Sequence, residues 1–137
     1  AIDIISKRGD AHHDFGCYDT TSVDYPDIAR EVARAVARRQ YALGILVCSS
    51  GIGMSIAANK VPGVRAALCA DAETARGARL GNHANVLVLS LRTISPAIAQ
   101  EILDAWLATP WGDKPEDVAC VAQVAEIERK YGKECAS

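Results

Sequence analysis

A cysteine that opens a glycine-rich turn is the feature of this sequence best suited to chemistry. The run Cys48-Ser49-Ser50-Gly51-Ile52-Gly53-Met54-Ser55 follows an apolar segment of strand length and precedes a predicted helix. The two glycines allow the backbone to turn tightly, and the helix directs free N–H groups at a phosphate or a developing oxyanion. The thiol of Cys48 lies where the positive end of a helix favours a thiolate. The run predicts an anion-binding turn beside a reactive cysteine; the alternative is a tight turn with a buried structural cysteine.

Three common glycine-rich loops are excluded by counting along this run. A Walker A loop ends in Gly-Lys-Ser/Thr, and no lysine follows Gly53. A dinucleotide-binding loop needs a third glycine where Ile56 stands, and a phosphotyrosine-phosphatase loop needs arginine where Met54 stands. The turn therefore belongs to another class of anion site.

Two further segments could supply polar groups, because ligands of open α/β sheets bind beyond the carboxyl ends of the strands. The first is 81–85, interpreted as a second polar strand end, where Asn82 offers hydrogen bonds and His83 an acid or base near neutral pH. A solvated helix-to-strand turn is the alternative there. The second is the helix entry at Tyr25, whose ring points into the site or packs under the loop. His12 and His13 are adjacent on a predicted strand and are interpreted as surface or edge residues.

The elements that must position these residues alternate along the chain. Apolar runs predict strands over 43–48, 64–69 and 85–90, with a further short strand over 11–15. Helices are predicted before Gly9, after Pro26, over 54–60, from Asp71 to about Leu80, after Ser95, and from Pro115 to Gly132. Alternating strands and helices predict an α/β fold, a three-layer Rossmann-like domain with a central, mainly parallel sheet. The 43–48 run shows no polar alternation, so we expect its strand, which ends at Cys48, to be central.

Length and charge limit the function classes. The chain of 137 residues and 14.6 kDa fits a single domain over 1–137. A net charge of −2 gives no footprint for nucleic acid or an anionic membrane, and no apolar run spans a bilayer. The five cysteines are odd in number and lack C-x-x-C spacing, and no set of side chains has metal-ligand spacing, so we expect a cytoplasmic protein without a metal.

Four segments resemble one known family, that of type B ribose-5-phosphate isomerase and galactose-6-phosphate isomerase. They are Asp14-Phe15-Gly16, Ser22-Val23-Asp24-Tyr25-Pro26-Asp27, the long stretch from Gly44 to Ala67, and Asn82-His83-Ala84-Asn85-Val86-Leu87. The resemblance implies interconversion of aldose and ketose phosphates through a cis-enediolate, with no cofactor. It implies that Cys48 moves the proton between C2 and C1 and that Ser50 assists at the oxygens. It also implies substrate contacts from Tyr25, Ser49, Gly51, Ile52, Gly53, Met54, Ser55 and Asn82.

The sequence departs from the family pattern at several points. The family's first strand, which ends in Asp-His, has no counterpart after Ala1, so we expect it to be missing from this chain. The ring-opening histidine of the family corresponds to Gly81, which leaves His83 two positions away as a substitute catalytic residue. The segment 112–117 contains no arginine where family members clamp phosphate with two, and Ser49 stands where glycine is usual.

Three interpretations follow from this pattern. The first is an isomerase that acts on a sugar phosphate, ribose 5-phosphate to ribulose 5-phosphate. The second is a non-catalytic or partner-dependent subunit that binds phosphosugars. The third is a cysteine phosphocarrier domain, although there the cysteine would end the first strand. The resemblance further implies a homodimer or homotetramer in which the C-terminal helix, about 115–131, packs on a partner subunit.

Overall fold

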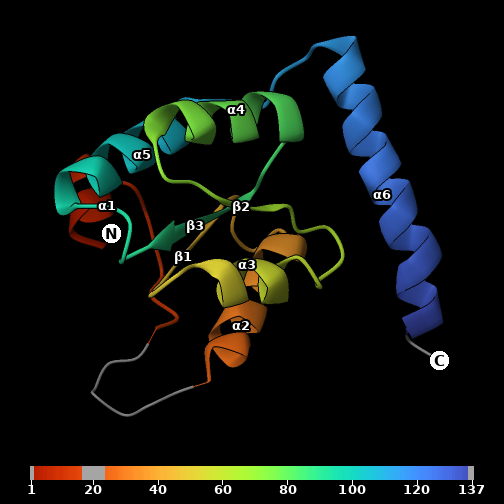
Figure 1. Ribbon diagram of the computed structural model, residues 1–137, viewed down its shortest axis with the longest axis horizontal. Helices are drawn as coiled ribbons and strands as arrows, with labels where there is room; N and C mark the ends of the chain where they lie inside the picture. The colour runs from red at the N-terminus through yellow and green to blue at the C-terminus, as the bar shows by residue number, and fades with distance from the viewer. Residues whose placement is uncertain (1, 17–23, 136–137) are drawn as a thin grey trace.

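The computed structural model describes residues 2–16 and 24–135, and it shows a sheet between two layers of helices (Figure 1). The elements in chain order are α1 (Ile2–Arg8), α2 (Tyr25–Ala37), β1 (Gly44–Cys48), α3 (Ile52–Ala58), β2 (Ala66–Leu68), α4 (Ala72–Asn82), β3 (Val86–Ser90), α5 (Pro96–Ala108) and α6 (Pro115–Cys135). The alternation confirms the α/β prediction.

The three strands are parallel and lie in the order β1-β3-β2. Cys48 is in register with Ser90, so β1 and β3 end at the same edge of the sheet. All five residues of β3 are buried, and β3 rather than β1 is the central strand of the described sheet. The expectation that the strand ending at Cys48 is central was therefore wrong, because covered faces do not require paired edges.

The two faces of the sheet carry separate apolar cores. Helices α2 and α3 pack on one face around Leu46, Val86 and Val88. Helices α4 and α5 cover the other face, where Leu87 and Trp106 are completely buried. The alternate side chains of β3 thus serve opposite cores, as the period of a strand requires.

Helix starts follow the predicted capping residues. Pro26 lies in the first turn of α2. The side chain of Asp71 accepts the N–H of Thr74, and that of Ser95 accepts the N–H of Ile98. The predicted end of the last helix at Gly132 was wrong, because α6 continues to Cys135 and Gly132 does not adopt the left-handed conformation that ends helices.

Residues 11–15 do not form the predicted strand. Among the described residues they have no ladder partner, and a strand requires one. They run past β1 on the side away from β3, where a cavity separates the two segments. Helix α1 precedes them and ends as predicted at Gly9, which is left-handed with φ 79°.

Helix α6 stands apart from the layered body and meets it mainly at α4 (Figure 1). Apolar side chains on this helix remain exposed, among them Val124, Ile127 and Tyr131. None of the helices within the described residues is both long and apolar enough to cross a bilayer.

Candidate functional site

Cys48 lies at the carboxyl end of β1, where the chain turns into α3. Its Sγ accepts the N–H of Gly51 at 3.0 Å, and the side chain is only partly buried. Gly51 adopts φ 78°, and a Cβ there would lie 2.5 Å from Leu68 Cδ1. Only glycine satisfies both conditions, so the residue at 51 fixes the N–H that faces the sulfur.

The backbone of the central strand holds this turn in position. Leu91 N–H donates to Cys48 O at 2.9 Å, and Arg92 N–H donates to Ser49 O at 3.1 Å. The Oγ of the buried Ser90 donates to the same Ser49 oxygen at 2.9 Å. Three bonds to β3 and its extension therefore make the cysteine turn a rigid part of the sheet edge.

The turn presents N–H groups next to the sulfur. Ile52 N–H donates to Ser50 Oγ at 3.3 Å, and the first intrahelical bond of α3 joins Ser55 N–H to Gly51 O. The N–H groups of Gly53 and Met54 meet no acceptor within the described residues, as is usual in a first helical turn. The Met54 side chain is buried in the core, so only its backbone faces the site. The arrangement can hold an anion or an oxyanion beside a thiol.

Tyr25 from the start of α2 lies against this turn. A Cβ on Gly53 would come within 2.6 Å of the Tyr25 ring, so the ring rests directly on the glycine backbone. The Tyr25 side chain is 49% exposed. Of the two orientations open from the sequence, the structure has the ring at the surface of the turn rather than buried beneath it.

Asn82 and His83 lie at the other edge of the sheet. Helix α4 returns the chain from the carboxyl edge to the amino edge, and β3 begins after it at Val86. The bond from Gly44 N–H to Asn85 O marks this edge, because Gly44 begins β1. Because 81–85 precedes β3 and Cys48 ends β1, the two segments lie at opposite edges of the sheet within one chain. Asn85 is buried and joins two loops, accepting from Arg65 N–H and donating to Gly63 O.

The ring of His83 is already engaged within the chain. It stacks on Trp111 with centroids 5.1 Å apart and planes 3° apart, and its Nε2 donates to Gly112 O at 2.8 Å. Arg65 and Arg79 lie 5.3 and 5.8 Å from the Trp111 ring, and Arg79 also lies 5.1 Å from Trp106. These contacts give His83 a structural place in a stack that joins α4 to the α5–α6 connection.

Two other residues, Cys69 and Arg92, are relevant to the role predicted for Cys48. Burial raises the pKa of Cys69 to about 11, so this second described thiol stays protonated at neutral pH. Arg92 was missed by the sequence analysis, although it lies two residues after the end of the apolar strand β3. Its backbone N–H donates to Ser49 O, so the main chain of Arg92 lies at the same edge of the sheet as the thiol.

Comparison with known proteins shows which family this chain resembles. The family model described as "Ribose/Galactose Isomerase" matches residues 1–124. D-erythrulose-4-phosphate isomerase of Pectobacterium atrosepticum is 44% identical over 107 residues, which are 77% of this chain and 70% of that protein.

Two solved structures are also similar to this chain over most of its length. Ribose-5-phosphate isomerase B of Clostridium thermocellum superposes with a TM-score of 0.91 at 42% identity, covering 95% of this chain and 87% of that chain. The Mycoplasma genitalium enzyme with bound ribulose-5-phosphate gives a TM-score of 0.87 at 32% identity, over 93% and 84% of the two chains. This chain therefore belongs to the ribose/galactose isomerase family and is a sugar-phosphate isomerase.

Proposed function

We propose that the protein interconverts ribose 5-phosphate and ribulose 5-phosphate. The observation that carries the proposal is the Cys48 thiol, held by the Gly51 N–H at 3.0 Å beside the N–H groups of Gly53 and Met54. Isomerisation of an aldose to a ketose needs a base at carbon and donors at the oxygens, and these residues supply both. Three described cysteines are free thiols, which supports a reducing cytoplasm as the setting.

The proposed reaction moves one proton between neighbouring carbons. Cys48 as thiolate removes the proton from C2 of the open-chain aldose, and the C2–H electron pair forms the C1–C2 double bond of a cis-enediolate. The negative charge on oxygen is stabilised by the N–H groups of the turn. Ser50 relays a proton between the two oxygens, and the Cys48 thiol then returns its proton to C1. No electron acceptor is needed, because the oxidation at C2 balances the reduction at C1.

Arg92 is the side chain we propose for the phosphate. Its backbone is bonded to Ser49, so the guanidinium extends from the same edge as the anion-binding turn. Arginine matches phosphate oxygens with two parallel donors. This assignment provides a cation for a chain whose segment 112–117 contains no arginine.

Replacing Arg92 with alanine is expected to raise KM for the sugar phosphate about tenfold or more, because a charge-assisted contact is lost. We expect kcat to change less, since the phosphate keeps its charge during the reaction. Arg38→Ala, at the end of α2, is the matched control and leaves KM unchanged. Steady-state kinetics check the result, and an unaltered KM in Arg92→Ala would remove this residue from the site.

The site requires residues from two copies if Asn82 contacts the substrate. Asn82 and Cys48 lie at opposite edges of the sheet, with all of β3 between those edges. Large apolar side chains are exposed around the Cys48 turn, including Ile52, Ile56 and Leu91. Exposed apolar surface of this kind favours association. We propose a homodimer, or a homotetramer built from it, in which the exposed face of α6 also packs on a partner subunit.

The contacts that His83 makes with Trp111 and Gly112 favour a second substrate. Ribose 5-phosphate closes into a furanose ring, whereas a four-carbon ketose 4-phosphate has no free hydroxyl for ring closure. A chain whose histidine is stacked on Trp111 and bonded to Gly112 O is suited to the open-chain substrate. D-erythrulose 4-phosphate is therefore the second candidate, in line with the name of the Pectobacterium relative.

Substitutions at 81 and 83 test the choice between the two substrates. Gly81→His is expected to raise kcat/KM for ribose 5-phosphate about tenfold or more through general acid–base catalysis and to leave that for D-erythrulose 4-phosphate unchanged. A Cβ at Gly81 meets only Asp117 Oδ1, at 4.0 Å, so the first atom of the new side chain meets no clash. His83→Asn keeps a residue that tolerates the left-handed backbone; it is expected to lower the free energy of unfolding by about 1 kcal/mol with little change in kcat. A tenfold loss of kcat in His83→Asn with unchanged stability would instead make His83 catalytic.

A further inference from the structure

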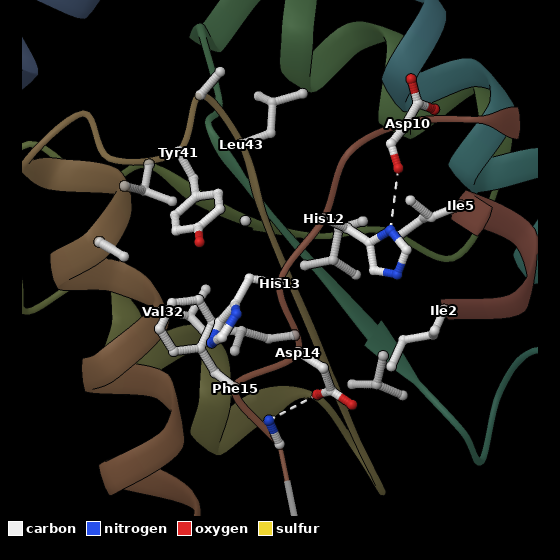
Figure 2. Close-up of a pocket in the computed structure, with 18 of the residues that line it drawn as sticks. Ile2, Ile5, Asp10, His12, His13, Asp14, Phe15, Val32, Tyr41 and Leu43 are labelled. Atoms are coloured by element: carbon white, nitrogen blue, oxygen red, sulfur yellow. Dashed lines mark hydrogen bonds between the residues drawn. The ribbon is translucent and has the colours of Figure 1, made fainter.

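Ser90 is the last residue of β3, and it buries a hydroxyl at the end of an otherwise apolar strand. The four residues before it, 86–89, are all valine or leucine, and only 4% of Ser90 is exposed. Burying a hydroxyl costs free energy unless a hydrogen bond compensates, so a serine here needs a partner. The cavity beside β1 in Figure 2 does not supply one, because neither Ser90 nor Ser49 is among its described lining residues.

The partner of the Ser90 hydroxyl is the turn that carries Cys48. Alternation along β3 places Ser90 on the face of the sheet that α2 and α3 cover, where the chain turns from Cys48 into α3. There its Oγ donates to Ser49 O at 2.9 Å. The same oxygen accepts the N–H of Arg92 at 3.1 Å. The carbonyl that directly follows Cys48 is therefore held by two donors, one from a side chain and one from the backbone.

This carbonyl sets the orientation of the residues that follow it. Ser49 O and the N–H of Ser50 belong to one planar peptide group, so bonds to the oxygen fix the plane from which the chain continues. The next N–H, that of Gly51, donates to Cys48 Sγ at 3.0 Å. A rotation of the 49–50 peptide plane would move the Gly51 N–H away from the sulfur.

Two donors restrain this plane more strongly than one. A carbonyl oxygen accepts hydrogen bonds over a broad range of directions, so the Arg92 N–H alone would leave the 49–50 peptide able to pivot about that bond. The Ser90 hydroxyl comes from the strand itself and reaches the oxygen as a second donor, which removes this freedom. Groups that move protons must be held within about 0.5 Å of their productive geometry, so the restraint matters for chemistry at Cys48.

We propose that Ser90 is a positioning residue for isomerisation, which acts through the 49–50 peptide and the Gly51 N–H on Cys48. The inference rests on the proposed function, in which Cys48 is the base. Holding the base in place for proton transfer raises kcat, whereas the phosphate is bound by other groups. Loss of the Ser90 hydroxyl is therefore expected to lower kcat about tenfold and to change KM by less than about twofold.

Steady-state kinetics of Ser90→Ala and a matched serine variant test this split. Ser95→Ala is the control, because Ser95 Oγ also makes one hydrogen bond to the backbone, accepting the N–H of Ile98 at 3.2 Å at the start of α5. Both variants are expected to lower Tm, but only Ser90→Ala is expected to lower kcat. Ser90→Thr keeps the hydroxyl and is expected to hold kcat within about threefold of the wild type. If Ser90→Ala does not fold, Ser90→Cys, which offers only a weak S–H donor, replaces it in each measurement.

Amide hydrogen exchange at Gly51 gives a readout that does not depend on turnover. The Gly51 N–H is protected by its bond to Cys48 Sγ, and release of the 49–50 peptide weakens that bond. We expect this amide to exchange about fivefold or more faster in Ser90→Ala than in the wild type, and at the wild-type rate in Ser95→Ala.

The double variant of Ser90→Ala with Cys48→Ala separates failure of this inference from failure of the proposed function. Because Ser90 acts through Cys48, Ser90→Ala is expected to have no further effect on kcat in the Cys48→Ala background. The inference is overturned by an equal loss of kcat in both backgrounds, by wild-type kcat in Ser90→Ala, or by wild-type exchange at Gly51 in that variant. Full turnover in Cys48→Ala alone would overturn the proposed function and this inference together.

Discussion

Replacing Cys48 with alanine is expected to lower kcat for sugar-phosphate isomerisation by about 10²–10⁴-fold, the usual cost of removing a general base. The Gly51 N–H loses its sulfur acceptor in this variant, but the turn keeps its three bonds to β3 and its extension. Binding of the sugar phosphate therefore stays within a few-fold of the wild-type value. Steady-state kinetics and titration calorimetry on the same preparation separate the two effects.

Cys120→Ala is the matched control for this prediction, since Cys120 is an exposed thiol on α6 away from the turn. It is expected to retain full activity. Retention of most turnover by Cys48→Ala would make Cys48 structural and would leave Ser50 as the nearest candidate base. Loss of folding in Cys48→Ala, seen by circular dichroism, is not expected because the side chain is only partly buried.

Mixing two inactive variants is expected to restore activity if the site is shared between copies. Cys48→Ala and Asn82→Ala each disable every site in their own homodimer. In random mixed dimers one site combines an intact Cys48 with an intact Asn82, so about a quarter of the sites become active again. Unfolding and refolding the two variants together, followed by a rate measurement, checks this number.

The control for complementation is a mixture of each variant with itself at the same total concentration, which stays inactive. Light scattering on the wild type should give a particle larger than the 14.6 kDa chain. A monomer that is fully active at all dilutions contradicts the shared site. Failure of complementation with an intact dimer would instead show that Asn82 acts elsewhere.

Much of the fold could be predicted from the pattern of apolar runs. The runs over 43–48 and 85–90 became β1 and β3, and Asp71 and Ser95 cap the helices predicted after them. The position of β1 in the sheet could not be predicted from the sequence. A continuous apolar run reports that both faces of a strand are covered, and it carries no information on whether both edges are paired.

Only part of the candidate site could be predicted from the sequence. The Cys48 turn could be predicted because the cysteine, the glycines and the start of the helix are close together in the sequence. In the structure the Gly51 N–H donates to Cys48 Sγ at 3.0 Å. The separation of His83 from Cys48 within one chain was not predicted, because it depends on the edge of the sheet at which each residue lies. Arg92 escaped notice because its proximity to Ser49 arises only from strand pairing.

The stack around Trp111 makes the chain an optical reporter of its own association. The sequence has two tryptophans: Trp106 is completely buried, and Trp111 is 47% exposed next to His83 and two guanidinium groups. Solvent and neighbouring charges shift indole emission, so a partner that covers the Asn82 edge changes the fluorescence of Trp111 while Trp106 provides a constant background. Assembly of the unlabelled protein can thus be followed at nanomolar to micromolar concentration, alongside the catalytic rate in the same cuvette.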